Sequence, residues 1–431
     1  MFELANDKGK RVEISDIGSY MVNSPIINIS VSEGVVSDTS ENVISTLTNS
    51  DQLFESKDIK PSLSHSEQIS IKNNLMFIKT HKCGTSTVTD VFYLRGVRKR
   101  LNFVLVPYKT DINTVVDYRH LLPPRPGSVY NMQCVHGIFQ PDAEHTIMPK
   151  ETSLYSTIVR SPVSQFKSAF SFFRNEDKMR MKYGDLSIDA LIGHYLDKIS
   201  EPTEYTAPVI SGCINSVAKD LGWDAFKRRM LESTLQEKIN AFIEHLDQEM
   251  DFVMITDRMD ESLIILKEYL GWNMTDILYL NRNVSSKPKV TLSEETKARI
   301  LKYQVIDAQI FDHFNKSFEL HLHRVGREKV ASQVNEFVKM RESFENKCLN
   351  KDKNINNPNA SLRWEITEYG SNINVACTFL QNKPLVMTKI ITQLQLSQDY
   401  TIPIKGQEEP FLMRDIVSKI QQDYDNNEDL V

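Results

Sequence analysis

The fold of this 431-residue chain is decided by one stretch, Phe77-Ile78-Lys79-Thr80-His81-Lys82-Cys83-Gly84-Thr85-Ser86-Thr87. The apolar residues 75–78 predict a short buried strand, and apolar side chains at helical spacing predict a helix after the stretch, at Val88, Val91 and Phe92. In such a turn the loop amides and the first free N–H groups of the helix meet at one point, where the helix dipole favours negative charge. The stretch therefore predicts a loop that binds a phosphate-like anion.

The loop does not have the pattern of a nucleoside triphosphate P-loop, which is Gly, four residues, Gly, Lys and then Ser or Thr. It has one glycine, Gly84, and its two lysines, Lys79 and Lys82, come before that glycine. The Walker lysine and the magnesium-binding hydroxyl are both out of place. A nucleotide kinase or triphosphatase is a weaker hypothesis for this reason.

A second motif follows another predicted strand, residues 154–159. Arg160 stands at the end of that strand, Pro162 suits the first turn of a helix, and phenylalanines recur at helical spacing up to Phe173. We expect the phenylalanines of this helix to lie in the core. Ser168 follows Arg160 by eight positions.

Strand-like runs near residues 75, 129, 154 and 251 are followed by helical patterns. This alternation predicts parallel strands joined by helical crossovers, so the expected fold class is α/β, a parallel sheet flanked by helices. A further strand-like run covers residues 277–280.

The two motifs resemble those of Golgi carbohydrate sulfotransferases, most of all the galactose-3-O-sulfotransferase and cerebroside sulfotransferase family. The family's loop reads roughly Leu-Lys-Thr-His-Lys-Thr-Gly-Ser-Ser-Thr, which is similar to residues 78–87, and its Pro-Val-Ser-x-Phe-x-Ser-x-Phe segment is similar to residues 162–170. Looser similarities occur at residues 131–136, 220–223 and 251–263. The resemblance covers about residues 70–348. It implies the sulfotransferase version of the P-loop fold, with the donor at the carboxyl ends of the strands.

The resemblance implies 3′-phosphoadenosine-5′-phosphosulfate (PAPS) as the sulfate donor. Lys82 is expected at the bridging or leaving oxygen, with Lys79 beside it on the 5′-phosphosulfate. Arg160 and Ser168 are expected to hold the 3′-phosphate, with residues 281–283 as a weaker candidate. The complete predicted cradle for the 5′-phosphosulfate is Lys79, Thr80, Lys82, Cys83, Gly84, Thr85, Ser86 and Thr87. No metal is expected, and no compact spacing of His, Asp and Glu indicates a metal site.

The acceptor hydroxyl has to lose a proton, and a histidine is the natural base near neutral pH. Two histidines are candidates for this base. His136 lies in a segment similar to the family's Cys-Asn-His, although Val135 replaces the asparagine, and His81 lies inside the donor loop beside Lys82. The histidine that is not the base would orient the sugar.

Family resemblance alone suggests the acceptor, the 3-hydroxyl of a terminal galactose on a glycolipid or glycan. One alternative is a sulfotransferase that acts on a glycosaminoglycan. Another is a catalytically inactive glycan- or nucleotide-binding relative, in which Cys83 and Val135 would be substitutions that accompanied the loss of activity. Nucleic-acid binding fits poorly, because no zinc-finger spacing, RNA-recognition motif or strongly basic domain occurs. Nothing in the sequence indicates the oligomeric state.

The net charge of −6 is unevenly distributed. Residues 1–70 hold 11 acidic and 5 basic side chains, so they alone account for −6. Seven basic residues face one acidic residue, Asp90, between Lys72 and Arg100, which predicts positive charge around the anion loop. The basic run at the end of that segment, Arg95, Arg98, Lys99 and Arg100, is either a solvated face or a device that steers an anionic substrate.

Five cysteines leave at least one free thiol, and we expect it at Cys83. The neighbouring Lys82 and the helix N-terminus would lower the pKa of this thiol, so a reactive cysteine is a further alternative. Asn-x-Ser/Thr triplets permit glycosylation at Asn28, Asn273, Asn283, Asn315 and Asn359.

Three regions are expected: an acidic, Ser-rich extension at 1–70, the sulfotransferase domain at 71–348, and a C-terminal extension at 349–431. No run of about 18 to 20 apolar residues and no signal-peptide pattern occurs. We therefore expect no membrane span in this chain. The resemblance implies the Golgi lumen or membrane, so the lack of an anchor is a departure from the family.

Overall fold

The computed structural model describes residues 71–105, 121–125, 127–280 and 291–349, together with residues 387, 388, 391, 392 and 395. All of them belong to one compact unit, Glu67–Val431. The predicted extension at 1–70 and the predicted loop at 281–283 lie outside the described residues. The proposed domain limits therefore stay predictions.

A four-stranded parallel sheet forms the centre of the described fold, in the order β2-β1-β3-β4. Its strands are β1 (Asn74–Ile78), β2 (Met132–Gln133), β3 (Ser153–Val159) and β4 (Phe252–Ile255). Each of them is buried along its whole length, which explains why the sequence shows continuous apolar runs. The predicted α/β class with parallel strands is confirmed.

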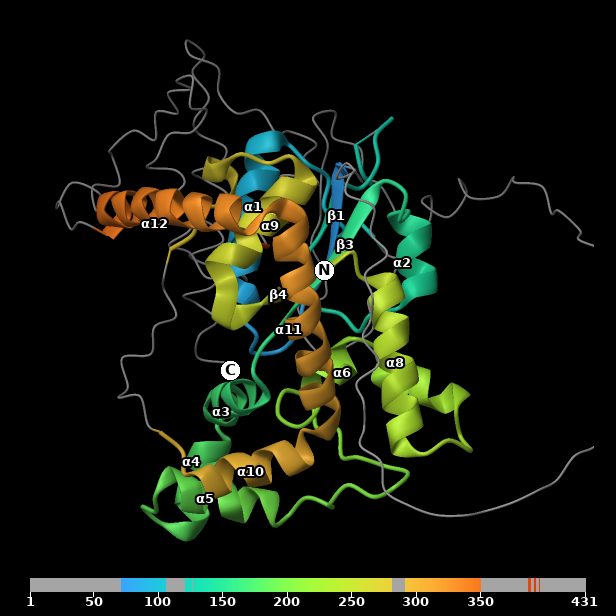
Figure 1. The fold of residues 1–431 in the computed structure, drawn as a ribbon, viewed down its shortest axis with the longest axis vertical. Coiled ribbons are helices and arrows are strands. Elements are labelled where there is room, and N and C mark those ends of the chain that lie inside the picture. The colour runs from blue at the N-terminus through green and yellow to red at the C-terminus, as the bar shows by residue number, and fades with distance from the viewer. Residues whose placement is uncertain are drawn as a thin grey trace, which may run out of the picture. The chain divides into compact units, whose positions relative to one another are not determined.

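Helices cover both faces of the sheet (Figure 1). One face carries α1 (Thr85–Lys99) and α9 (Met259–Leu270), and the other carries α2 (Pro141–Ile147) and α8 (Leu235–Glu249). Two long helices complete this part, α11 (Val305–Val325), which packs against β4, and α12 (Arg327–Leu349). Short elements are α6 (Ser216–Asp220), α7 (Trp223–Phe226) and the 3₁₀ helices η3 (Lys227–Arg229), η4 (Thr256–Arg258) and η5 (Met274–Ile277).

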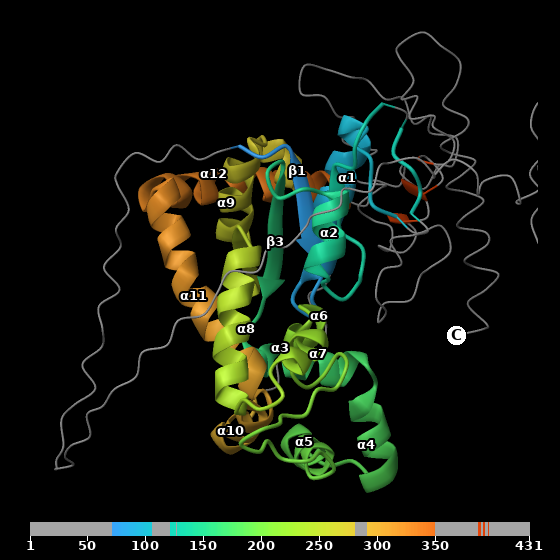
Figure 2. The same ribbon diagram turned by 90° about the vertical axis from the view of Figure 1, so that its right-hand side faces the viewer.

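A helical lobe lies beyond the carboxyl ends of the strands (Figures 1 and 2). It consists of α3 (Pro162–Phe172), α4 (Asn175–Tyr183), α5 (Ile188–Leu196) and α10 (Glu294–Tyr303). This lobe has its own hydrophobic core, separate from the core around the sheet, and Phe166 and Phe170 belong to it. Pro162 occupies the first turn of α3, as predicted.

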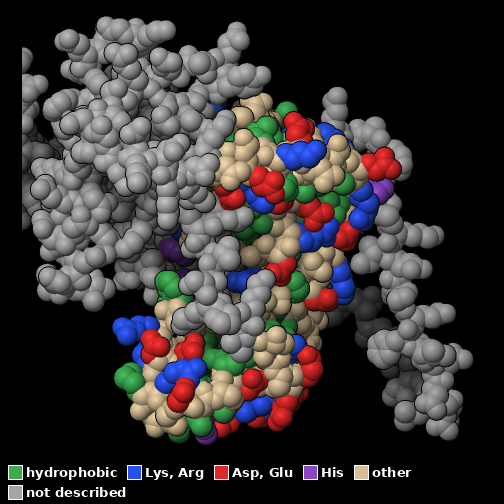
Figure 3. Space-filling view, turned by 90° about the vertical axis from the view of Figure 1, so that its left-hand side faces the viewer, with side chains coloured by type: hydrophobic (Ala, Val, Ile, Leu, Met, Phe, Trp, Pro, Cys, Tyr) green, Lys and Arg blue, Asp and Glu red, His purple; other side chains and the backbone are tan. Residues whose placement is uncertain are grey.

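The surface of the helical lobe is mixed in character (Figure 3). On the face drawn there, hydrophobic side chains lie among Lys, Arg, Asp and Glu side chains. The large hydrophobic residues that this lobe exposes include Phe172, Met181 and Leu186. The phenylalanines of α3 therefore do not all lie in the core, which corrects the expectation for Phe172.

The strand expected at residues 277–280 is absent from the described fold, where residues 274–277 form η5 instead. Asn273 and Asp276 form a reciprocal capping box at this point, with the backbone N–H of Asn273 donating to Asp276 over 3.1 Å. Local capping favours a helical turn over an extended strand, although Ile277 and Leu280 are buried as apolar residues of a strand would be. The prediction was wrong because an apolar run reports burial more reliably than it reports backbone conformation.

The described residues of the C-terminal extension pack on the main core. Met387 and Ile391 are fully buried, and Thr388 lies 2.9 Å from the hydroxyl of Tyr93. The Gln395 side chain accepts from the backbone N–H of Phe103 and donates to its carbonyl, over 2.9 and 3.0 Å. Within the part of the chain that the structure describes, no helix is both long and apolar enough to cross a membrane.

Candidate active site

The predicted anion loop connects β1 to α1 at the carboxyl end of the sheet. Lys82 and Gly84 both have left-handed backbone angles, with φ of 63° and 78°. Gly84 is the N-cap residue of α1, and no side chain of the described residues caps this helix end. The first turn of α1 thus presents its N–H groups to the loop, as an anion site requires.

Threonine hydroxyls hold this loop against the neighbouring strands. Thr80 donates to the Ile158 carbonyl of β3 over 2.5 Å, and Thr85 donates to the Thr80 carbonyl over 3.3 Å. The hydroxyl of Thr256 lies 2.7 Å from the Cys83 carbonyl. The predicted cradle residues Ser86 and Thr87 are in the first turn of α1, where both are half-buried.

Arg160 brings the two sequence motifs together. It follows β3 directly, and its Nη1 donates to the Lys82 carbonyl over 3.2 Å. Its Nε is buried and has no hydrogen-bond partner among the described residues, which is unusual for a buried donor. Ser168 lies farther along α3 and is half-buried.

The loop lysines are not surface lysines. Lys79 is only 7% exposed, and burial lowers its pKa although Cys134 and Asp90 act in the opposite direction. Burial also lowers the pKa of Lys82, and the neighbouring Arg160 lowers it further. Lys82 and Arg160 are thus two like charges that an anion between them would stabilise.

Asp220 contacts the predicted donor loop, and sequence reasoning missed it. Its carboxylate accepts from the backbone N–H of His81 over 2.6 Å and lies 2.8 Å from the Nδ1 of the same histidine. Both side chains are buried, and burial raises the pKa of Asp220 while the bonds to His81 lower it. In the sequence, residues 220–223 carry only a loose similarity to the family, because nothing in a linear sequence links α6 to the donor loop.

His136, the other candidate base, lies beyond the short strand β2 and faces His81. The centroids of the two imidazole rings are 5.0 Å apart. The pKa of His136 is held well below its ordinary value by burial, by Lys79 and by His81. His136 is therefore neutral at neutral pH, and the structure brings both candidate bases to the same loop.

Gln165 also contacts the donor loop, and its role was not predicted. Its amide group donates to the His81 carbonyl over 3.1 Å and to the Ser216 hydroxyl over 2.7 Å. Gln165 is buried on α3, so it links the loop to α6, the helix that ends at Asp220. The conformation of His81 is thus fixed from two sides.

Cys83 does not have the properties of a reactive thiol. It is a free cysteine, as expected, but it is fully buried, and its Sγ lies 3.4 Å from the His81 carbonyl. Burial raises its pKa to about 12. The expected lowering by Lys82 and the helix end was wrong, because desolvation of the thiolate outweighs both effects.

The basic run of α1 does not surround the anion loop. Arg95 forms an ion pair with Asp276 and lies over the ring of Trp272 at 4.3 Å, and Arg98 donates to the Thr275 carbonyl over 3.3 Å. Arg95 lies about 15 Å along the helix axis from its first residue, because each residue adds about 1.5 Å. The predicted concentration of positive charge at the loop is corrected: these two arginines anchor η5. The exposed Lys99 and Arg100 fit a solvated face.

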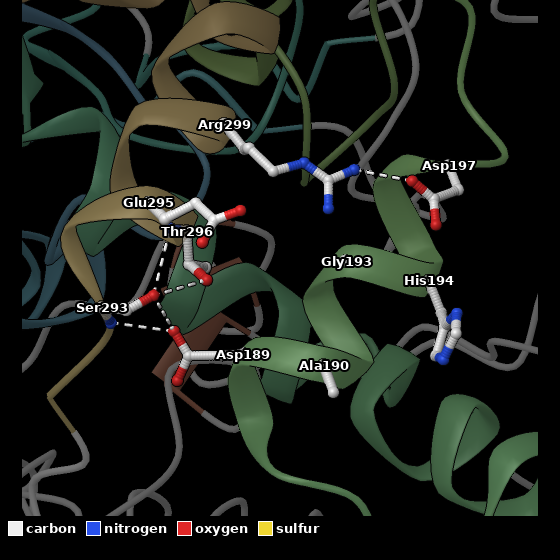
Figure 4. Close-up of a pocket in the computed structure, with 9 residues that line it drawn as sticks. All are labelled: Asp189, Ala190, Gly193, His194, Asp197, Ser293, Glu295, Thr296 and Arg299. Carbon is white, nitrogen blue, oxygen red and sulfur yellow. Dashed lines mark hydrogen bonds and ion pairs between the residues drawn. The ribbon is translucent and has the colours of Figure 1, made fainter.

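A pocket in the helical lobe lies between α5 and α10 and contains none of the predicted site residues (Figure 4). Asp189 of α5 accepts from the backbone N–H and hydroxyl of Ser293, over 2.8 and 2.7 Å, and Arg299 pairs with Asp197 over 2.6 Å. These polar groups are satisfied by one another, and they hold α10 against α5. The remaining lining residues are Ala190, Gly193, His194, Glu295 and Thr296.

A parallel sheet flanked by helices, with a loop after β1 that leads into an uncapped helix and an arginine after β3, defines an α/β protein of the P-loop-like class. The particular family follows from comparison with known proteins. The family model described as Galactose-3-O-sulfotransferase matches residues 31–368, so this chain belongs to the galactose-3-O-sulfotransferase family.

Individual relatives are distant. A human protein named galactosylceramide sulfotransferase is 27% identical over 269 residues, which are 61% of this chain and 61% of that protein. A mouse protein named galactose-3-O-sulfotransferase 3 is 26% identical over 295 residues, or 67% of this chain and 65% of that protein. The chain therefore spans less than two thirds of the length of these relatives.

Proposed function

We propose that this protein transfers a sulfuryl group from PAPS to the 3-hydroxyl of a terminal galactose on a glycolipid or glycan. The observation that carries the proposal is the contact between the two anion motifs, in which Arg160 donates to the carbonyl of Lys82. The relatives' names supply the galactose, and family membership supplies the donor class. By the same family argument we propose the Golgi as its location.

Several features of the loop fit a donor with phosphate and sulfate groups. No side chain of the described residues caps the first turn of α1, and Gly84 lets the backbone come close to an anion. Arg160 has a buried Nε without a partner among the described residues, and Lys82 lies near it. We assign Lys82 to the bridging oxygen, Lys79 and residues 83–87 to the 5′-phosphosulfate, and Arg160 with Ser168 to the 3′-phosphate.

The donor, when bound, supplies the electrophilic sulfur and a phosphate leaving group. Lys82 and the amides of α1 would stabilise the negative charge that develops on the leaving oxygen and the sulfuryl oxygens. Such charge stabilisation by fixed cations and amides is usually the largest contribution of a protein to this kind of transfer.

We assign the general base to His81. Its Nδ1 faces the Asp220 carboxylate, so we assign the ring N–H to Nδ1, where it would donate a hydrogen bond to the carboxylate and leave the lone pair on Nε2. That Nε2 is buried and has no hydrogen-bond partner among the described residues, so an acceptor hydroxyl would satisfy it. His136 is neutral and adjacent, and we assign it to the orientation of the sugar.

The donor assignment is tested by thermal shift with adenosine 3′,5′-bisphosphate and, separately, with Mg-ATP. A ligand at one hundred times its dissociation constant adds about 2.7 kcal/mol of stability. The bisphosphate should stabilise the protein, and Arg160→Ala should abolish this effect. Arg299→Ala is the matched control, because Arg299 is an ion-paired arginine outside the proposed site. A larger shift with Mg-ATP than with the bisphosphate would refute the donor assignment.

The acceptor and the base are tested by transfer of labelled sulfate from PAPS to galactosylceramide and to a β-galactoside. His81→Gln should lower the rate by about a hundredfold to ten-thousandfold, the usual contribution of a general base. His136→Gln should have a smaller effect on kcat, with a rise in the KM of the acceptor. If the His81 variant and the wild type had equal rates, His81 would not be the base. The base would then be His136, or the reaction would use no histidine base.

A further inference from the structure

Phe172 is an aromatic residue in an unexpected position. It is the last residue of α3 and is 59% exposed, whereas Phe166 and Phe170 of the same helix are fully buried. The ring lies beside the proposed donor loop, where its exposed part is accessible to a ligand.

The surroundings of Phe172 connect it to both proposed reacting groups. The Nζ of Lys82 lies over its ring, 3.6 Å from the centroid. Phe173 meets Phe172 edge to face, with centroids 5.1 Å apart, and lies 6.2 Å from the ring of His81. A Cβ on Gly212 would come within 2.1 Å of the Phe173 ring, so Gly212 leaves the space that this ring occupies.

The position of Lys82 shows at which end of the donor the Phe172 ring lies. Lys82 is the cation assigned to the bridging oxygen, so the ring at 3.6 Å from its ammonium lies at the sulfuryl end. The adenine ring of the donor is separated from the sulfur by the ribose and the 5′-phosphate. At the sulfuryl end the molecule that must come within about 3 to 3.5 Å of the reacting atom is the acceptor.

We propose that Phe172 is the platform on which the acceptor galactose ring stacks. The axial 4-hydroxyl of galactose leaves the hydrogens of C3, C4 and C5 together on one face of the sugar. These weakly positive hydrogens match the negative face of an aromatic ring. The inference rests on the proposed sulfuryl transfer, and it makes Phe172 a specificity-determining residue, because glucose lacks this continuous apolar face.

The test uses the full-length chain with Phe172→Leu, which keeps an apolar side chain of similar size, and Phe172→Tyr, which keeps the ring. The Leu variant should raise the KM for a β-galactoside by about tenfold or somewhat less, the usual effect of losing one aromatic contact. The KM for PAPS should stay within a factor of two or so of the wild-type value, since that contact is not assigned to the donor. The Tyr variant should behave like the wild type.

Leu320→Ala is a matched control, because Leu320 is also 59% exposed but lies on α11. It should change neither KM. A rise in the KM of PAPS with the KM of the galactoside unchanged would make Phe172 an adenine contact and overturn the proposal. A fall in kcat with both KM values unchanged would mean that Phe172 only positions Lys82. That result would also overturn the proposal.

Direct binding separates failure of the platform from failure of the proposed reaction. A methyl β-galactoside is titrated into protein saturated with adenosine 3′,5′-bisphosphate, and saturation-transfer NMR records contact with the sugar hydrogens. Clearly weaker binding by the Leu variant than by the wild type and the Tyr variant supports the platform even if no galactoside is sulfated. Sulfation of galactosides with equal binding by all three proteins keeps the reaction and refutes the platform.

Discussion

The carboxylate of Asp220 lies 2.8 Å from the Nδ1 of His81 and also accepts the backbone N–H of that residue. The two residues are 139 positions apart in the chain and are both buried. One carboxylate thus contacts both the backbone of the loop and the imidazole ring of His81. This geometry is the basis for proposing His81 as the general base, since a carboxylate at Nδ1 orients the histidine in Asp–His pairs.

Asp220→Asn should lower kcat by about a hundredfold to ten-thousandfold, the range expected for loss of a working base. The amide N–H₂ of asparagine would donate to Nδ1 and force the proton onto Nε2, which removes the lone pair there. Binding of adenosine 3′,5′-bisphosphate, measured by calorimetry, should stay close to wild type. If the affinity for the bisphosphate and the melting temperature fell strongly together with kcat, Asp220 would be a structural residue only.

Gly84→Ala should weaken binding of the bisphosphate by about tenfold or more and should also lower stability. An Ala at φ 78° costs about 1–2 kcal/mol, and its Cβ would lie 3.0 Å from the Cε of Met259, so the backbone would shift at the N-terminus of α1, where we propose that the donor binds. Gly127→Ala is the control, because Gly127 has a similar φ of 74° but free space around it. It should lower the melting temperature without changing the affinity; equal affinity losses in both variants would contradict the assignment.

Arg95→Met should lower the free energy of unfolding by about 3 kcal/mol, because it leaves the buried carboxylate of Asp276 without its closest cation. Chemical denaturation measures this loss. The association rate of the donor and its dependence on salt should not change, because Arg95 lies far along α1 from the loop. A slower, less salt-dependent association would restore the hypothesis that this basic run steers the substrate.

His321 should make the protein less stable in acid. Burial lowers its pKa to about 4, helped by Arg324, whereas an unfolded histidine has a pKa of about 6.5. Its stabilising contribution is complete above pH 6.5 and is lost as the pH falls to about 4, because only the unfolded chain binds the proton. The loss amounts to about 3 kcal/mol.

Unfolding of the wild type and of His321→Gln, measured between pH 7 and pH 4, checks this prediction. The variant loses the contact with the Tyr269 hydroxyl, which lies 2.7 Å from Nδ1, so it should be less stable at pH 7. The difference between the two proteins should shrink towards pH 4. A constant difference across this range would contradict the assigned titration.

Much of the fold was predictable because its signals are local. Short apolar runs predicted the four strands, and the spacing of Val88, Val91 and Phe92 predicted α1. The family was predictable from two ordered motifs, residues 78–87 and 162–170. The failures were also local: the apolar run at 277–280 predicted burial but not the capped turn that Asn273 and Asp276 form.

Local composition was less reliable for charge and reactivity. Lys82 beside Cys83 suggested a lowered thiol pKa, but the folded chain buries that sulfur and raises its pKa to about 12. The basic residues after the loop suggested an electropositive site, but Arg95 and Arg98 contact η5. Burial and partners determine these properties, and both depend on residues that are distant in the sequence.

Three features can be predicted from the chain alone: the order of strand, loop and helix, the residue types of the anion loop, and the family. These depend on spacing along the chain. Three others follow from tertiary packing: Arg160 reaches the Lys82 carbonyl, Asp220 contacts His81, and Phe172 is exposed beside the loop. The first two are contacts between residues of different elements, and the third depends on which elements cover the Phe172 ring. All three follow from the packing of the sheet and helices rather than from spacing in the sequence.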